Sequence, residues 1–436
     1  MNFKKLLAQS LVWRSLYFAS MLLVNVFLSR FLKAAGTGNL YYLTNIFSFI
    51  QLVASLSLEA GITYYAAGKV IAANKLLWFS ILWSFLVAAF VLAGSFYYQY
   101  YLLRAPLVTA MEYCFFAVCY ITGLLLVNYC SSLFYAQGNF IISNVILVVL
   151  NIGFVCSLLF EHNTADNYGV QATMRNYFLV FFLQGISLVV AFAVKNKSWA
   201  YFSFPSLLQC RQLLAYSITA LSGNIIFFLV YRIDYLFVHA NPASCSDADL
   251  GNYIQVSKMG QLLLIVPQII ASVIFPGTAS GAGRAELNTS LMIIARLLSQ
   301  LFLCIIVVSF LFGGQLFVFV FGQTFNRMQV PFLIELPGIF CLSVLALLSA
   351  YFGGKGNLRV TVAGATIALA AVVIGDYFLV PVYGIIGAAV ISTAGYFINV
   401  LYSLLRFYKD YSISWVDFFK WRKQDYYWLR SIITGK

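Results

Sequence analysis

Charged residues are scarce in this sequence. Of its 436 residues, 9% are charged and 62% are hydrophobic, whereas a soluble domain carries roughly 25% charged residues. The mean hydropathy is +0.90, and 41 Phe and 29 Tyr supply side chains suited to a lipid-facing surface and to interfacial belts. This balance excludes an ordinary soluble domain and predicts an all-α polytopic membrane protein.

Catalytic and metal-binding motifs are also missing. The chain has two histidines and eight cysteines, and none of the cysteines forms a CxxC pair. No HExxH, GxSxG or glycine-rich phosphate loop is present. The longest outward connections, 161–175 and 239–250, are too short to house a catalytic domain. We therefore expect no enzyme activity and no bound metal cofactor, and we interpret the cysteines as small apolar core residues.

Positive charge exceeds negative charge, with a net charge of +13. Most cations lie at the ends of apolar runs, where they set topology, so we do not expect a nucleic-acid partner. Alternate connections are rich in Lys and Arg, starting with Lys4 and Lys5, and the positive-inside rule then places both termini in the cytoplasm. No small-residue cleavage site follows Lys5, so the first apolar run is expected to stay as a span. Cys245 falls in a predicted outer loop and should be accessible to thiol reagents from outside.

About twelve apolar runs are long enough to cross a bilayer, which needs about 20 residues. The runs are 10–32, 40–66, 76–98, 107–134, 139–160, 175–194, 211–238, 251–275, 290–312, 329–352, 359–380 and 384–406.

The chain also repeats itself at about half its length. Gly38-Asn39 opens the second span and Gly251-Asn252 opens the eighth, while Gly138-Asn139 and Gly356-Asn357 open the fifth and the eleventh. This spacing predicts two six-helix lobes, 1–197 and 198–408, related by a parallel repeat. A basic, aromatic tail, 409–436, follows and suits a segment lying on an anionic cytoplasmic leaflet.

Several cations lie at membrane depth, where a charge costs at least about 2.5–3.5 kcal/mol on insertion scales. Arg14 lies in the first span, Arg232 in the seventh and Lys258 in the eighth, so cations of the two lobes could face one cleft. Such a cleft favours an anion, and the Arg fork suits a phosphate. Arg30 matches Arg232 in the repeat and is the fourth candidate, although it lies near a span end, as Arg296 does, where snorkelling also explains a cation. For each of the buried charges, a structural ion pair remains the alternative to a transport role.

Acidic residues at membrane depth suggest a coupling site. Asp234 and Asp376 lie at matching depth near the outer ends of their spans, and Thr393 lies about two turns into the last span. Carboxylates with a hydroxyl and backbone carbonyls could hold a hard cation or a proton. Arg232 and Asp234 are two residues apart, about 200° around a helix, so they cannot share a face.

Several stretches are similar to one family. LGNYIQVSKMGQLLLIVPQIIASVIFP (250–276) resembles the eighth helix of Wzx-type oligosaccharide flippases, and so does the preceding YRIDYLFV. FGQTF, LPGIF and YFGGKGN within 318–357 resemble helices nine and ten. LVPVYGIIGAAVIST (379–393) resembles the motif between helices eleven and twelve, and SRFLKAAGTGNLYYL resembles the first loop. The resemblance covers nearly the whole chain and rests on the order and spacing of these motifs.

The resemblance implies the multidrug/oligosaccharidyl-lipid/polysaccharide exporter fold, with two lobes around a V-shaped central cavity and alternating access. It implies a bacterial inner-membrane protein that flips an undecaprenyl-diphosphate-linked glycan during O-antigen, capsule or exopolysaccharide assembly. A polysaccharide polymerase and glycosyltransferases would be its partners. The lipid II flippase branch of this superfamily has a sodium site to which Asp234, Asp376 and Thr393 are similar, but Val372 stands where that site has an amide.

Other functions remain open at this stage. A drug/cation antiporter of the same superfamily would prefer an acidic cavity, whereas this one is expected to be basic. The lipid II flippase branch usually has two additional helices that this sequence lacks. A membrane glycosyltransferase or glycan polymerase would need a longer outward loop with acidic or arginine pairs. Accumulation of a lipid-linked glycan on the inner face, with loss of the surface glycan, would distinguish a flippase from these.

Overall fold

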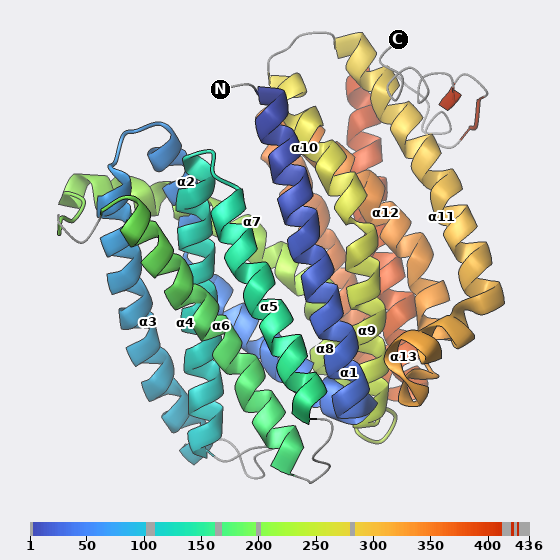
Figure 1. Cartoon of the computed structure of the whole chain (residues 1–436). Helices are drawn as coiled ribbons and strands as arrows, with labels where there is room; N and C mark the ends of the chain where they lie inside the picture. Colours follow the sequence, from blue (N-terminus) through green and yellow to red (C-terminus); the bar gives the residue numbers. More distant parts are fainter. Residues whose placement is uncertain are drawn as a thin grey trace. The chain divides into compact units, whose positions relative to one another are not determined.

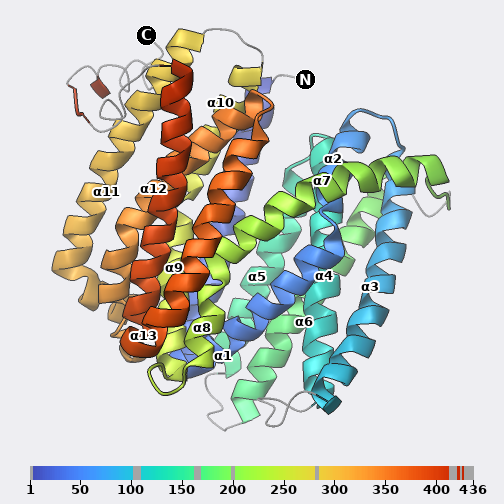
Figure 2. The same ribbon diagram turned by 180° about the vertical axis from the view of Figure 1, so that it is seen from behind.

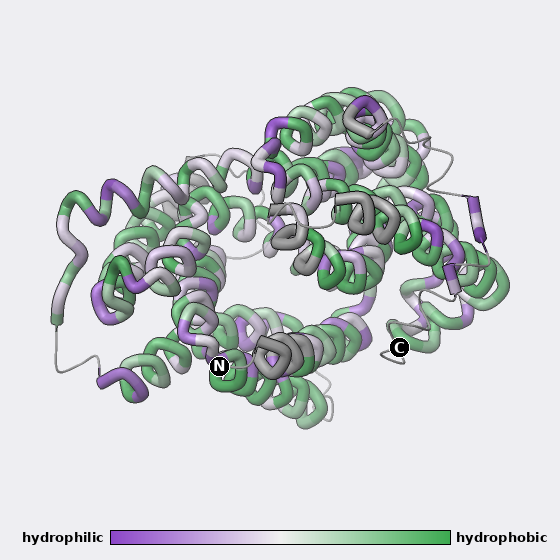
Figure 3. The backbone as a smooth tube through the Cα atoms, turned by 90° about the horizontal axis from the view of Figure 1, so that it is seen from above, coloured by the Kyte–Doolittle hydropathy of each residue, from purple (hydrophilic) through white to green (hydrophobic). Residues whose placement is uncertain are grey.

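The structure is a computed structural model that describes residues 3–101, 110–161, 168–197, 202–279, 284–411, 420–422 and 425–426. These residues form helices and no strands, so the all-α prediction is confirmed. Hydrophobic residues predominate along most of the helices (Figure 3). Helices suit such a sequence because each satisfies its own backbone hydrogen bonds, which lipid cannot do.

The described helices are α1 (Phe3–Ser55), α2 (Leu58–Ala67), α3 (Ala73–Tyr101), α4 (Ala110–Ala136), α5 (Ile141–Glu161), α6 (Tyr168–Lys195), α7 (Leu207–Arg232), α8 (Asp234–Ala240), α9 (Asp247–Leu263), α10 (Ile265–Ala279), α11 (Arg284–Phe321), α12 (Gln329–Gly354) and α13 (Leu358–Tyr411), with a 3-10 turn, η2 (Gln323–Phe325) (Figure 1).

Ten helical stretches of the described chain are long and apolar enough to cross a membrane. Two of them, α1 and α13, have 53 and 54 residues and each contains one residue outside helical geometry. The breaks are Lys33 (φ 59°) and Gly384 (φ 58°). Each break divides its helix into two membrane-length segments, which brings the total to the twelve expected spans.

Several spans are interrupted near their middle or end. Leu56 and Ser57, with φ of 50° and 53°, separate α1 from α2, and a turn at Ile233 separates α7 from α8. Positive φ in a residue other than glycine costs about 1–3 kcal/mol. Interruptions of this kind free backbone groups from the helix and place polar side chains at membrane depth.

The chain forms two compact units. Unit 1 comprises Met1–Leu32 and Leu40–Ile225, and unit 2 comprises Lys33–Asn39 and Ile226–Lys436. In unit 1, α4 packs against α2, α3 and α6, and α5 packs against α6. In unit 2, α12 packs against α9, α10, α11 and α13, and α13 also contacts α8; Figure 2 shows α12 beside α13 from behind. The lobe boundaries drawn from the sequence repeat stay a prediction.

Cys245 differs from the sequence expectation. Its side chain is only 6% exposed, and burial raises the pKa of its thiol. The prediction that outside reagents would reach it is therefore wrong, because a thiol reagent needs an accessible thiolate. The neighbouring Ala243 is exposed and offers a better position.

Candidate functional site

Asp234 is the centre of a buried polar cluster in unit 2. It begins α8 directly after the turn at Ile233, and it is 1% exposed. Its carboxylate accepts hydrogen bonds from the Tyr253 hydroxyl, from Ser392 Oγ at 3.1 Å and from the Tyr235 backbone N–H at 2.9 Å. These donors, and the N-terminal end of α8, stabilise the ionised form of a group that burial penalises.

Asp376, on α13, is fully buried and lies close enough to Asp234 for the two charges to interact. Neither of its carboxylate oxygens has a hydrogen-bond partner among the described residues. A buried carboxylate in this situation is stable only when it is protonated or when a cation lies beside it. Asp376 therefore leaves two oxygens available for a proton or a small cation.

Glu335, on α12, is the third acid of the cluster. It is 3% exposed, it accepts a hydrogen bond from Ser257 Oγ at 3.4 Å, and its charge interacts with that of Asp234. The sequence showed Glu335, Tyr253 and Ser392 within apolar spans but gave no reason to join them to Asp234. Their residues are 19 to 158 positions from Asp234, so only helix packing brings them together.

Thr393 lies one residue beyond the hydroxyl that contacts Asp234. Its Oγ1 donates to the Ile334 backbone carbonyl at 2.8 Å, while the adjacent Ser392 donates to Asp234. Successive residues point about 100° apart on a helix, so the two hydroxyls serve different neighbours. In this structure Ser392 supplies the hydroxyl of the cluster, and Thr393 connects α13 to α12.

Two cations of unit 2 lie together beside the acids. Arg232 and Lys258 are partly exposed, and their charges interact. The Arg232 guanidinium donates to Gln261 Oε1 at 3.3 Å and lies over the rings of Phe228 and Tyr235, at 5.7 and 5.9 Å. Two like charges held close together repel each other, and an anion bound beside them would offset that repulsion. Asp234 is buried, whereas Arg232, on the other side of the turn at Ile233, keeps partial exposure.

The two candidate cations of the first span belong to unit 1. Arg14 is exposed, and its guanidinium lies 5.5 Å from the centre of the Tyr135 ring. Arg30 is exposed as well. The guanidinium of Arg14 can still bind a phosphate at its edge, since stacking on a ring occupies only its face.

Two of the repeated Gly-Asn pairs, Gly38-Asn39 and Gly251-Asn252, meet inside unit 2. A Cβ atom on Gly251 would lie 1.9 Å from the Ala34 carbonyl oxygen, and one on Gly38 would lie 2.5 Å from the Asp247 carbonyl oxygen. Both glycines are needed because only a missing Cβ permits backbones to approach this closely. The segment Lys33–Asn39 therefore packs tightly against the start of α9.

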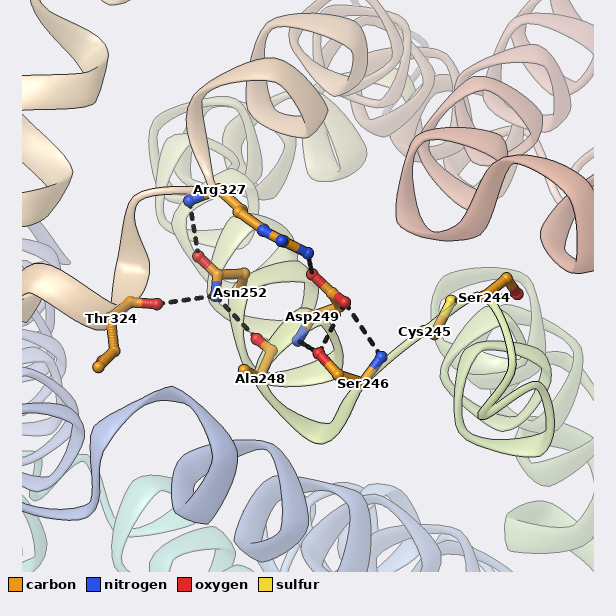
Figure 4. Close-up of polar contacts among 8 residues, drawn as sticks. All are labelled: Ser244, Cys245, Ser246, Ala248, Asp249, Asn252, Thr324 and Arg327. Atoms are coloured by element: carbon orange, nitrogen blue, oxygen red, sulfur yellow. Dashed lines mark hydrogen bonds and ion pairs between the residues drawn. The ribbon is translucent and has the colours of Figure 1, made fainter.

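Side-chain hydrogen bonds and an ion pair also stabilise the packing at the start of α9. Figure 4 shows Asn252 donating to the carbonyl of Thr324 at 3.1 Å, and Arg327 paired with Asp249 at 2.7 Å. Thr324 Oγ1 in turn accepts from the Ala34 backbone N–H at 3.0 Å. Ser246 and Asp249 form a capping box at the beginning of α9. Segments far apart in the sequence, Lys33–Asn39, α9 and η2, are thus joined at one end of unit 2.

No family model matches the chain, and no curated protein matches it. Solved structures do. The lipid II flippase MurJ in an inward closed conformation is 14% identical, with a TM-score of 0.71, 94% of this chain covered and 89% of that one. The MATE transporter VcmN of Vibrio cholerae, as a point mutant, is 16% identical, with a TM-score of 0.66 and coverage of 95% and 99%.

A third similar structure is a MOP superfamily transporter from Pyrococcus furiosus, whose description states that the reverse polarity of its binding pocket suggests a different function. It is 14% identical, with a TM-score of 0.63 and coverage of 93% and 96%. The TM-scores show a shared fold, and identities of 14–16% show nothing beyond the fold. The chain therefore has the fold of the MOP superfamily transporters, the fold to which both MurJ and the MATE proteins belong.

Proposed function

We propose that this protein is a membrane transporter that flips an undecaprenyl-diphosphate-linked oligosaccharide from the cytoplasmic to the periplasmic leaflet by alternating access, during surface polysaccharide assembly. The observation that carries the proposal is the pair Arg232 and Lys258, whose charges lie close together and remain partly exposed. A diphosphate is opposite in charge to such a pair, and the Arg fork binds two phosphate oxygens at once. Arg14 and Arg30, exposed in unit 1, are the proposed contributions of the first span.

A multidrug exporter for cationic compounds is the alternative of the same fold. It would need an acid that a drug could reach. The acids of unit 2 that cluster around Asp234 are 0–3% exposed, whereas the nearby cations are partly exposed. The accessible charges beside this acidic cluster are thus positive, which favours an anionic substrate. The identity of the glycan, and the choice between it and lipid II, depend on contacts with sugars that charge alone does not decide.

We also propose that Asp234 and Asp376 hold a sodium ion or a proton that drives the return of the empty transporter. The support is the buried carboxylate of Asp376, whose oxygens have no hydrogen-bond partner among the described residues, beside a second buried carboxylate. A cation there would remove the repulsion between them and stabilise whichever conformation holds it. Thr393, which bonds to α12, would act indirectly by fixing α13, while Ser392 is the nearer hydroxyl.

The function is tested by deleting the gene in its host and by reconstitution. Loss of surface glycan, with accumulation of its lipid-linked unit on the inner face, is the expected result for a flippase. Purified protein in proteoliposomes should then move that lipid-linked unit faster than lipid II or a cationic dye. Faster movement of lipid II would favour the lipid II alternative, and efflux of the dye alone would overturn the anionic-substrate proposal.

The inner bacterial membrane, cytoplasmic termini, and a polysaccharide polymerase and glycosyltransferases as partners belong to the same proposal. Basic residues at the predicted inner ends of the spans support the orientation. Co-purification of the polymerase with the intact protein from native membranes is the expected outcome for the partner proposal.

A further inference from the structure

The described part of the C-terminal tail is fastened to α11 by a buried ion pair. Arg296 and Asp425 are 3% and 1% exposed, with Nη2 to Oδ1 at 2.7 Å and Nε to Oδ2 at 2.8 Å. This two-point geometry is the strongest that Arg and a carboxylate form. The snorkelling expected of Arg296 is therefore wrong, since its guanidinium is buried and paired with Asp425 of the tail.

Three further hydrogen bonds hold the same segment. Trp421 Nε1 donates to Ser299 Oγ at 2.8 Å, and the Tyr426 hydroxyl donates to Gln300 Oε1. Asp425 also accepts the Arg422 backbone N–H at 3.2 Å, which shapes the tail itself. We call this arrangement the tail clasp: Trp421, Asp425 and Tyr426 on Arg296, Ser299 and Gln300. Contacts at three successive positions of one helix face fix the height of the tail along α11.

That height coincides with the edge of an apolar surface. Among the α11 side chains that the structure describes, residues 291–321, the large exposed apolar ones begin at Leu301, which is 48% exposed. They continue to Phe310 and Phe319, at 69% and 76%. Arg296 lies five residues before Leu301, or about 7.5 Å along the helix axis. In a chain that spans a membrane, exposed apolar residues face the lipid tails, so the tail clasp lies at the level of the headgroups.

The clasp displays a cationic and aromatic group at this level. Lys420, Trp421 and Arg422 are all exposed, and Trp421 keeps 52% of its surface accessible although its indole N–H is bonded to Ser299. Tryptophan favours the membrane interface, and each Lys or Arg near an anionic leaflet adds to binding. We propose that the clasped tail forms a site for the anionic headgroups of bilayer phospholipids, with Lys420 and Arg422 as its cations.

This site is separate from the transport proposal, because it uses none of the residues near Asp234 or Arg232. It differs from an unstructured basic tail in one respect that can be measured. A free tail would bind anionic lipid through its total charge, whereas the clasp requires Asp425 to hold two particular cations at one height on α11.

The test uses the purified full-length protein in detergent, titrated with phosphatidylglycerol or phosphatidylcholine and followed by native mass spectrometry. We expect the wild type to retain phosphatidylglycerol in preference. The double variant Lys420→Gln/Arg422→Gln should lose about 25-fold in that preference, since each cation near an anionic leaflet contributes about 5-fold. Lys409 is an exposed cation at the end of α13, so Lys409→Gln is the matched control. It should leave the preference for phosphatidylglycerol nearly unchanged.

Equal retention of both lipids by the wild type, or equal losses in the double variant and the Lys409 control, would overturn the proposal. Retention of an added acidic peptide in place of phosphatidylglycerol would overturn it in favour of a protein partner. Asp425→Ala should lose the lipid preference although both cations remain, and the exchanged pair Arg296→Asp/Asp425→Arg should recover part of it. If Asp425→Ala impairs folding, Lys420→Gln/Arg422→Gln still tests the proposal, because both of its substitutions lie on the exposed surface. An unchanged preference in well-folded Asp425→Ala would show that the clasp is irrelevant.

Discussion

Replacing Asp376 by Asn separates the cost of burying a charge from the benefit of binding a cation. Neither Asp376 oxygen accepts a hydrogen bond from a described residue, so Asp376→Asn replaces a group that must bind a proton or a cation by a neutral one, without breaking a bond. In the absence of a coupling ion, the variant should therefore be at least as stable as the wild type. Asp234→Asn is the opposite case, because Asp234 accepts three hydrogen bonds and each bond to a charged group contributes about 1.5–3 kcal/mol.

The expected size of the ion effect follows from linkage. A cation that binds only the folded state stabilises it by about 2.7 kcal/mol at one hundred times its dissociation constant. Thermal unfolding of the purified protein in NaCl, compared with choline chloride at equal ionic strength, should show this gain in the wild type. In Asp376→Asn the gain should disappear. If the coupling ion is a proton, the wild type and the variant should differ in their response to pH and agree in their response to sodium.

Glu112→Gln serves as the control for loss of one acidic charge, because Glu112 lies in the first turn of α4, in unit 1. Its response to sodium should match the wild type. An identical response of wild type and Asp376→Asn to both sodium and pH would refute the coupling site and leave Asp376 as a structural residue. A large loss of stability in Asp376→Asn without ions would contradict the reasoning from its missing hydrogen bonds.

Three further outcomes are expected. Gly251→Ala should reduce transport strongly, because its Cβ would lie 1.9 Å from a backbone oxygen; Gly153→Ala, with no atom within 4 Å of the added Cβ, should leave transport in the same assay unchanged. Arg232→Ala should lower export about tenfold or more, the equivalent of one charge-assisted bond of about 1.5–3 kcal/mol, with only partial recovery in Arg232→Lys; normal export by well-expressed Arg232→Ala would exclude its phosphate role. An impermeant thiol reagent should label Ala243→Cys but not Gly435→Cys in intact cells, and labelling at 435 would reverse the proposed orientation.

The sequence alone determined the class of the protein and its division into spans. Long apolar runs with few charges can be stable only in lipid, and only helices satisfy the backbone there, so length and composition were enough. Pro381 and Gly384 indicate in the sequence that the helix is interrupted at Gly384. Nothing in the apolar pattern indicated that Lys33, Leu56 and Ser57 would take positive φ. Those conformations depend on packing by neighbouring helices, which a local pattern does not contain.

Tertiary structure decided which side chains meet. The sequence indicated Asp234 and Asp376 as acids at one depth. It did not indicate that Ser392, and not Thr393, would supply the hydroxyl beside Asp234, or that Tyr253 and Glu335 would join the cluster. Those contacts follow from the rotation of each helix about its axis, which changes by about 100° from one residue to the next. In the same way, Arg296 and Asp425 are 129 residues apart. In the sequence, snorkelling accounts for Arg296 at a span end, and a surface tail accounts for Asp425. Only folding brings the two charges to 2.7 Å and removes both from solvent, because pair formation depends on distance in space, which the order of residues along the chain does not set.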